Sequence, residues 1–212
     1  MQILIVDDHP FIRKGLIHVL QYELANEVVR IDEAGSHSEA LSCLSAASYD
    51  LILLDVSLEG RNGLDLLMWI RKERPHTPVL VISMHPEDQY ALRAIRLGAA
   101  GYLSKQSAPA ELMTAITGIR THGRYISHRL SLLMAEDLGR TGHGTVLHEH
   151  LSNREMEIGG MIARGESPAE IAEALNLSVK TVNTYRTRLL NKLAVRNNVG
   201  LTSYFIHNNL IP

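Results

Sequence analysis

Short apolar runs alternate with longer amphipathic stretches over the N-terminal part of the chain. Three runs lack a helical period and are bounded by polar or turn residues, as buried parallel strands are: residues 2–6, 51–54 and 79–82. Apolar residues recur at helical spacing in three further stretches, residues 10–24, 63–73 and 108–121. In the second of these stretches, the face expected to be buried includes Leu64, Leu67 and Met68.

Weaker strand patterns near residues 28–33 and 101–103 complete a fivefold alternation of strand and helix. This alternation predicts an α/β fold with a doubly wound sheet of five parallel strands. Because crossovers between parallel strands are right-handed, the carboxyl ends of all the strands meet at one edge, where open α/β sheets bind ligands. The residues directly after the strands are therefore the candidates for a functional site.

Polar and charged residues follow four of the predicted strands. Asp7 and Asp8 come after the first strand, Asp55 after the third, Ser83 after the fourth and Lys105 after the fifth. A single aspartate in such a place is most often a solvated loop residue or a helix cap, so the joint occurrence carries the argument. Three carboxylates repel one another unless a cation lies among them, and Mg²⁺ prefers oxygen ligands. A lysine and a hydroxyl beside them would stabilise a phosphoryl group on one carboxylate.

The C-terminal part of the chain is predicted to be helical. Residues 139–150 lack apolar periodicity and are typical of a linker. Ser152 and Ser167 each precede a glutamate by three residues, so they are expected to cap two helices, and Pro168 stands at the first helical position of the second. Two more helices are expected over residues 179–193 and 199–208.

A tight turn near Asn176 joins the second and third of these helices, which is helix-turn-helix geometry. Val182, Leu189 and Leu193 form the inner side of the third helix. Polar residues project from its outer side and are suited to a DNA major groove: Lys180, Asn183, Thr184, Thr187 and Arg188. A small helical bundle with a solvated polar face is the alternative for this segment.

Composition and charge agree with two globular domains. The chain has 212 residues, 45 % hydrophobic and 21 % charged, which excludes a disordered chain. Residues 1–138 carry 13 Lys or Arg against 17 Asp or Glu, whereas residues 151–212 carry seven against five, so only the C-terminal part is expected to meet nucleic acid. The single cysteine, Cys43, fits a reducing compartment. The N-terminus has no signal-peptide or membrane-span pattern, so we expect a cytoplasmic location.

The acidic residues and their companions resemble the receiver domains of two-component response regulators. Asp7-Asp8, Asp55 with Gly63 eight residues later, Ser83, Tyr102 and Lys105 occur in the order and spacing of that family, over essentially all of residues 1–122. The resemblance implies a flavodoxin-like receiver in which Asp55 accepts phosphate from a histidine kinase. It also implies that Asp8, Asp55 and the Ser57 carbonyl bind Mg²⁺, with Asp7 acting through water.

The remaining receiver roles follow from the same resemblance. Lys105 would pair with the phosphoryl oxygens, Ser83 would hydrogen-bond one of them, and the Tyr102 rotamer would follow Ser83. The chain departs from the family at Leu58-Glu59, where Met-Pro is usual, and at Gln106, where many receivers have proline. His9, before a helix-starting proline, is expected to be a surface loop residue and not a metal ligand.

Residues 151–195 closely resemble the LuxR/FixJ-type helix-turn-helix in its four-helix form, which places the whole chain near the NarL/FixJ response regulators. Tyr185 and the C-terminal residues 204–211 are similar to the BvgA- and EvgA-like subset. The predicted domains are a receiver over residues 1–122, a connecting helix and linker over 123–150, and a DNA-binding domain over 151–212. By resemblance, the outer residues of the third helix contact DNA, and Arg186 and Lys192 contact phosphates.

The final helix of the C-terminal domain predicts a homodimer. Its apolar residues exceed what one small bundle can bury, and in the family this helix forms a dimer contact: Val199, Leu201, Tyr204, Phe205 and Leu210. We expect the dimer to bind an inverted or direct repeat in double-stranded DNA.

The expected protein is a transcription factor, not an enzyme, whose DNA binding is controlled by phosphorylation of Asp55. One alternative is a Mg²⁺-dependent phosphohydrolase, disfavoured because the haloacid-dehalogenase type has Asp-x-Asp after the first strand and here the two acids are adjacent. A second alternative is a constitutive DNA binder with a vestigial receiver, for which Glu59 is the only indication. Nucleotide-binding glycine motifs do not occur.

Overall fold

The computed structural model describes residues 1–212 except 26, 59–60, 85–86, 141–146, 209 and 212. The chain divides into two compact units, Met1–Ala135 and Glu136–Pro212. Among the described residues, no helix is both long enough and apolar enough to cross a membrane.

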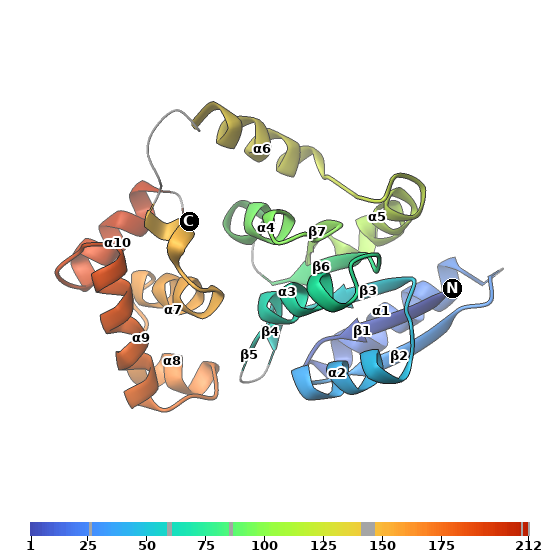
Figure 1. Ribbon diagram of the computed structural model, residues 1–212, viewed down its shortest axis with the longest axis horizontal. Coiled ribbons are helices and arrows are strands. Elements are labelled where there is room, and N and C mark those ends of the chain that lie inside the picture. Colours follow the sequence, from blue (N-terminus) through green and yellow to red (C-terminus); the bar gives the residue numbers. More distant parts are fainter. Residues whose placement is uncertain (26, 59–60, 85–86, 141–146, 209, 212) are drawn as a thin grey trace. The chain divides into compact units, whose positions relative to one another are not determined.

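The first unit contains a parallel five-stranded sheet in the order β2-β1-β3-β6-β7 (Figure 1). Its strands are β1 (Gln2–Val6), β2 (Arg30–Ala34), β3 (Leu51–Leu54), β6 (Val79–Ser83) and β7 (Gly101–Ser104). The helices between them are α1 (Pro10–Glu23), α2 (His37–Ala46), α3 (Gly63–Glu73), α4 (Glu87–Arg96) and α5 (Ala108–His122). The predicted doubly wound α/β fold is confirmed.

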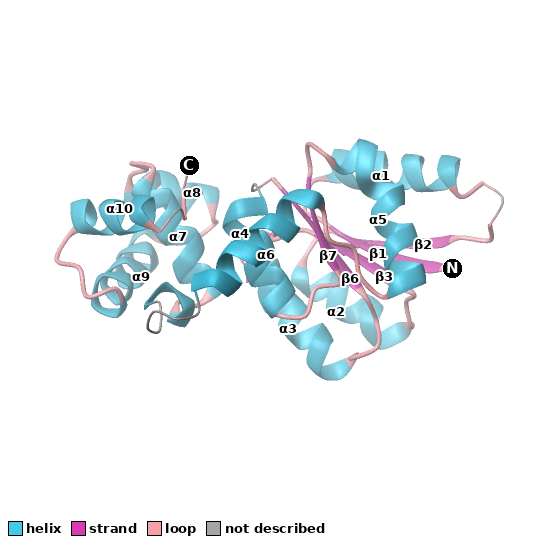
Figure 2. Ribbon diagram, turned by 90° about the horizontal axis from the view of Figure 1, so that it is seen from above, coloured by secondary structure: helices cyan, strands magenta, loops and turns pink. Residues whose placement is uncertain are grey.

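Helices cover both faces of the sheet (Figure 2). Alternating strand side chains build one core on each face. Ile3, Ile5 and Leu53 point to the face covered by α1 and α5, whereas Leu4 and Ile52 point to the face covered by α2, α3 and α4. Because both faces are covered, the strands are apolar at nearly every position, which is why they appear as unbroken apolar runs in the sequence.

Three details differ from the sequence-based expectations. In α3 the buried face is centred on Leu66, Leu67 and Ile70, and Met68 lies at its border with 51 % of its surface exposed. The weak strand near 28–33 is β2, which begins at Arg30 and runs to Ala34. A short antiparallel pair, β4 (Ser57–Leu58) with β5 (Arg61–Asn62), follows β3 and was not expected. Such two-residue strands have no periodicity to detect.

The connecting helix α6 (His128–Arg140) begins within the first unit. Leu130 is fully buried and belongs to the same apolar cluster as Tyr90 and Tyr102. The compact unit therefore extends beyond the expected receiver boundary at residue 122. The stretch expected to be a linker also differs at its ends, since α6 reaches Arg140 and a 3₁₀ helix, η1, spans Leu147–His150; residues 141–146 lie outside the described residues.

Among the described residues of the second unit, four α-helices follow η1: α7 (Asn153–Ala163), α8 (Pro168–Ala174), α9 (Val179–Lys192) and α10 (Asn198–His207). Ser152 and Ser167 form the two expected capping boxes with Glu155 and Glu170. Between α8 and α9, Asn176 adopts a left-handed conformation with φ 49°, which closes the tight turn of the helix-turn-helix. The predicted four-helix domain is confirmed.

Candidate functional site

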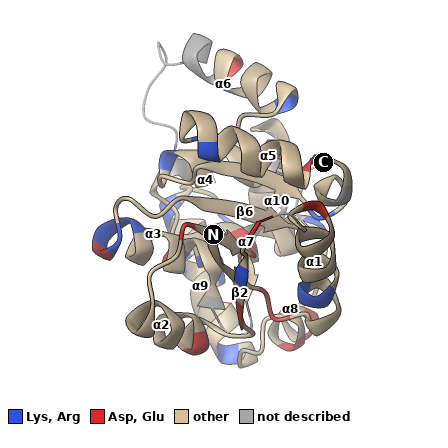
Figure 3. Cartoon of the chain, turned by 90° about the vertical axis from the view of Figure 1, so that its right-hand side faces the viewer, with Lys and Arg blue, Asp and Glu red and all other residues tan. Residues whose placement is uncertain are grey.

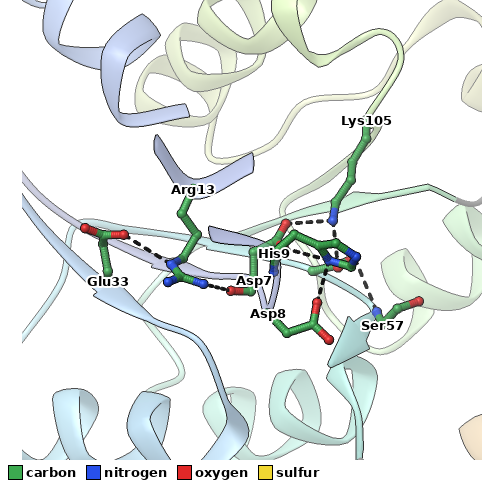
Figure 4. Close-up of polar contacts among 8 residues, drawn as sticks. Asp7, Asp8, His9, Arg13, Glu33, Ser57 and Lys105 are labelled. Carbon is green, nitrogen blue, oxygen red and sulfur yellow. Dashed lines mark hydrogen bonds and ion pairs between the residues drawn. The ribbon is translucent and has the colours of Figure 1, made fainter. Parts of the chain in front are cut away.

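The structure brings together the acidic residues and the lysine at the carboxyl edge of the sheet (Figure 4). Lys105 Nζ lies 2.7 Å from Asp7 Oδ2 and 2.8 Å from Asp55 Oδ2, so one ammonium bridges two carboxylates. All three side chains are almost fully buried, with exposed fractions of 3 to 4 % for Asp7 and Lys105 and 1 % for Asp55. Residues that are far apart in the sequence meet here because β1, β3 and β7 end at the same edge.

Burial and charge set the protonation behaviour of this cluster. Burial raises the pKa of Asp55 to about 6, Lys105 opposes this rise, and the neighbouring Asp7 adds to it. Burial alone would lower the pKa of Lys105, but Asp55 and Asp7 outweigh it and raise that pKa. Lys105 is therefore a fixed positive charge in a site with a surplus of carboxylates.

The donor set fits a hard divalent cation. Asp7, Asp8, His9 and Asp55 each offer one ligand atom, and these atoms lie within 4.8 Å of one another. Asp8 Oδ1 is buried and has no hydrogen-bond donor among the described residues. His9 Nδ1 lies 2.6 Å from this oxygen without the geometry of a hydrogen bond. A buried carboxylate oxygen that accepts no hydrogen bond, beside two other carboxylates, is suited to ligate a divalent cation.

His9 lies closer to this site than the sequence suggested. Its ring is 61 % exposed, as expected for a loop residue, but Nδ1 also lies 3.3 Å from Asp7 Oδ1. The His9 backbone N–H donates to the same oxygen over 2.8 Å. His9 therefore orients the Asp7 carboxylate through its backbone.

Two local features hold the loop after Asp55. The Ser57 N–H donates to Asp55 Oδ1 over 3.2 Å, and the Gly63 N–H donates to the Val56 carbonyl over 2.6 Å. A Cβ atom at Gly63 would overlap the carbonyl oxygen of Asp55. Glycine at this position is therefore required by the close backbone approach, which explains its fixed distance from Asp55 in the sequence. Glu59, the unusual residue of this loop, lies outside the described residues.

Ser83 and Tyr102 lie on neighbouring strands directly beneath the site. Both are completely buried, and the Tyr102 side chain is hydrogen-bonded to Ser83. Burial raises the pKa of Tyr102, which is therefore a neutral phenol. The Lys105 N–H donates to the Ser83 carbonyl over 2.7 Å, so a backbone hydrogen bond links Lys105 to Ser83.

A contact between α6 and α4 was not expected from the sequence. Ser127 Oγ donates to Glu87 Oε2 over 2.6 Å, and the Leu130 N–H donates to Ser127 Oγ over 3.0 Å, so Ser127 caps α6. Both side chains of the Ser127–Glu87 pair are buried. A serine three residues before Leu130 was a detectable capping signal, whereas Glu87 carried none.

In the second unit, α9 presents the expected polar face (Figure 3 marks its basic residues). Lys180, Asn183, Thr184, Thr187 and Arg188 are exposed, as predicted, and Val182, Leu189 and Leu193 are buried. The Thr184 and Thr187 hydroxyls donate to the carbonyls of Lys180 and Asn183.

The two residues expected to contact phosphates are engaged within the domain. Arg186 Nε donates to Asn198 Oδ1 over 2.6 Å, which ties α9 to the start of α10. Lys192 Nζ lies 2.6 Å from Glu155 Oε2, and its side chain is 41 % exposed whereas Glu155 is buried. Both cations thus have a structural role besides any contact with DNA.

The apolar surface of α10 differs from the expectation. Leu201 and Phe205 are fully buried in the domain core, and they pack inside the bundle, not on a dimer surface. Val199 and Ile206 are 77 % and 57 % exposed and line a groove with Thr202. Ile206 was not among the surface residues expected from the sequence. Which apolar residues of α10 are exposed depends on how α7 packs against it, and the sequence pattern does not show this.

Comparisons with known proteins agree with both units. The family described as response regulator receiver domain matches residues 3–117, and the family described as bacterial regulatory proteins, luxR family, matches residues 149–205. The response regulator UvrY of Escherichia coli strain K12 is 33 % identical over 210 residues, which is 99 % of this chain and 95 % of that protein.

Two further proteins are similar over nearly their whole length. The nitrate/nitrite response regulator protein NarP of Escherichia coli strain K12 is 32 % identical and covers 97 % of this chain and 94 % of its own. RcsB of Salmonella enterica serovar Typhimurium, solved bound to promoter rprA with phosphomimetic BeF₃⁻, aligns with a TM-score of 0.63 at 25 % identity, covering 96 % of this chain and 97 % of its own. The BvgA- and EvgA-like subset stays a prediction. The chain belongs to the NarL/FixJ family of two-component response regulators, with a receiver domain followed by a LuxR-type helix-turn-helix domain.

Proposed function

We propose that Asp55 is the phosphoacceptor of this response regulator and that its phosphorylation by a histidine kinase controls DNA binding by α9. The observation that carries the proposal is the Lys105 ammonium held between Asp7 and Asp55. Beside them lies the Asp8 oxygen that accepts no hydrogen bond among the described residues. This arrangement offers a nucleophilic carboxylate, a cation for the phosphoryl oxygens and ligands for a metal ion.

Asp8, Asp55 and the Ser57 carbonyl would hold Mg²⁺, with Asp7 acting through water. When bound, Mg²⁺ supplies positive charge that offsets the repulsion between the carboxylates and the incoming phosphoryl oxygens. The excess of carboxylates over Lys105 in this site supports that assignment.

In the proposed transfer, a carboxylate oxygen of Asp55 forms a bond to phosphorus while the P–N bond of the kinase phosphohistidine breaks. The electron pair of that bond returns to the imidazole nitrogen. Lys105, already 2.8 Å from Asp55, would neutralise charge on the phosphoryl oxygens. The product is an aspartyl phosphate in a buried, lysine-lined site.

Ser83 and Tyr102 would carry the signal away from Asp55. The Ser83 hydroxyl is bonded to Tyr102, so turning it towards a phosphoryl oxygen would release the tyrosine. Tyr102 packs in the same cluster as Tyr90 of α4 and Leu130 of α6. Freeing Tyr102 from Ser83 would therefore weaken the packing of the connecting helix α6 against the receiver. This helix continues into the segment that leads to the DNA-binding domain.

The exposed residues of α9 would contact DNA. Because the Thr184 and Thr187 hydroxyls already donate to carbonyls of the helix, their methyl groups and oxygen lone pairs would be the parts that meet the bases. Arg188 and Lys180 would supply charge to the phosphates or bases, and Arg186 and Lys192 would add phosphate contacts from beside their internal partners. Homodimerisation through the exposed Val199 and Ile206 of α10 would present two α9 helices to an inverted or direct repeat.

We infer a cytoplasmic location, because a regulator of transcription meets chromosomal DNA and a kinase in the cytoplasm. We also infer that the protein has no enzymatic turnover. Hydrolysis of a generic phosphate ester by the purified protein would instead favour the phosphohydrolase.

The test compares wild type and Asp55→Ala with and without Mg²⁺ and beryllofluoride, by DNA binding and oligomeric state. Tighter DNA binding and dimerisation in the wild type alone are the expected result. Equal behaviour of both proteins would overturn the phospho-switch and leave a constitutive DNA binder with a vestigial receiver.

A further inference from the structure

Arg13 lies on α1 and contacts the acidic pair through the backbone, outside the set of residues assigned above (Figure 4). Its Nη1 donates to the carbonyl oxygen of Asp7 over 2.6 Å. Its Nε pairs with Glu33 Oε2 of β2 over 3.1 Å. The Arg13 side chain is only 16 % exposed, so the guanidinium is fixed between a strand end and a neighbouring strand.

The position of this contact matters because of the peptide it holds. The Asp7 carbonyl belongs to the peptide that joins Asp7 to Asp8, and a peptide group is planar. The Asp7 N–H is already bonded to the Ala34 carbonyl over 3.1 Å. With both sides of Asp7 anchored, the plane of the Asp7–Asp8 peptide is held, which restricts where the Asp8 side chain can lie. Asp8 Oδ1 accepts no hydrogen bond among the described residues, and only the half-exposed His9 ring lies beside it, at 2.6 Å, so the backbone position contributes to where this oxygen lies.

Glu33 offsets the positive charge of Arg13, so Arg13 acts on the site by holding the Asp7–Asp8 peptide in position and not by adding charge. The Lys14 ammonium, 2.7 Å away, and Arg13 hold the pKa of Glu33 below its usual range, so Glu33 is ionised at neutral pH. Its charge compensates the guanidinium. Gly35 leaves room for this pair, since a Cβ there would come within 3.3 Å of Arg13 Nη1.

We propose that Arg13 is a positioning residue of the phosphoacceptor site, which holds the Asp7–Asp8 peptide so that both carboxylates face the metal position, with Glu33 as the group that holds Arg13. The inference rests on the proposed function of this site. Partners behind metal ligands commonly change metal affinity by about 10- to 100-fold when they are removed.

Lys14 provides a matched control. It is the next residue on α1 and also pairs with Glu33, but its side chain is 69 % exposed. Replacing Lys14 removes a cation from the same glutamate and leaves the Arg13 contact with Asp7 in place.

The experiment measures Mg²⁺ affinity of the full-length protein by calorimetric titration, together with the melting temperature without Mg²⁺. We expect Arg13→Ala to weaken Mg²⁺ binding about tenfold or more, Arg13→Lys and Glu33→Gln to weaken it less, and Lys14→Ala to leave it unchanged. If Arg13→Ala fails to fold, Arg13→Lys and Glu33→Gln carry the comparison.

Mg²⁺ affinity equal to wild type in the folded Arg13 variants, or a loss just as large in Lys14→Ala, would overturn the positioning role. A loss of melting temperature with unchanged Mg²⁺ affinity would assign Arg13 to stability alone and overturn it as well. These outcomes are separate from the beryllofluoride test of Asp55, because they need neither phosphorylation nor DNA. A wild type that binds no Mg²⁺ would reject both proposals.

Discussion

The Ser127 hydroxyl donates a 2.6 Å hydrogen bond to the Glu87 carboxylate, and this buried pair joins the start of α6 to the start of α4. The two residues are 40 positions apart. Since α4 begins just after the strand that carries Ser83, the connecting helix is attached beside the residues proposed to sense phosphorylation.

Ser127→Ala is therefore expected to weaken the coupling between the receiver and DNA binding. The variant loses the bond to Glu87 and the cap of α6, at a cost of about 1–3 kcal/mol in the free energy of unfolding. The ratio of DNA affinities with and without beryllofluoride should fall towards one. Ser131→Ala is the control, since the exposed Ser131 hydroxyl donates to the His128 carbonyl within α6; equal ratios in the two variants would contradict the prediction.

Gly63→Ala is expected to disrupt the acceptor loop. The added methyl group would overlap the Asp55 carbonyl, so the loop must move at a cost of about 2 kcal/mol or more. Acetyl phosphate should then react poorly with Asp55, as measured by phosphoprotein gels. Gly15→Ala in α1, where a Cβ meets nothing within 4 Å, should be neutral or stabilise by up to about 1 kcal/mol. Normal phosphorylation of Gly63→Ala would refute this account of the glycine.

The ion pair between Glu155 and Lys192 makes the free energy of unfolding of the DNA-binding domain depend on pH in the acidic range. Burial alone would raise the pKa of Glu155, but Lys192 and Ser152 together lower it from the ordinary value of 4.5. The stabilisation is therefore complete above about pH 4.5 and is lost as the pH falls through the lowered pKa. Glu155→Gln should cost about 1–2 kcal/mol at pH 7, and this cost should shrink as the pH falls below about 4.5, measured by urea denaturation. A difference independent of pH would contradict the role of charge.

Two cations of α9 are expected to differ in what their loss changes. Arg188→Ala should weaken binding to the operator by about 1–3 kcal/mol with little change in melting temperature. Lys192→Ala should lower the melting temperature because it leaves Glu155 buried without its cation, and it should reduce the slope of affinity against salt by about one. Salt-dependent DNA binding and thermal denaturation of both variants check this, and identical thermal stability would count against the structural role of Lys192.

Local patterns in the sequence predicted most of the fold and the main residues of the site. The five strands, the capping boxes at Ser152 and Ser167 and the turn at Asn176 depend on residues within one or two turns of each other, so their signals are readable along the chain. The meeting of Asp7, Asp55 and Lys105 followed from topology, because parallel strands with right-handed crossovers end at one edge.

Tertiary structure decided which side chains support that site and which surfaces remain exposed. Arg13 with Glu33, and Ser127 with Glu87, are paired across 20 and 40 residues, and Lys192 reaches Glu155 across 37. Periodicity cannot reveal such pairs, because either partner alone is an ordinary polar residue on a helix or strand. In the same way Phe205 is core and Ile206 is surface only because α7 packs against one side of α10. The sequence by itself determined the elements and the chemistry at the strand ends, whereas the packing of distant elements determined how that chemistry is held and connected.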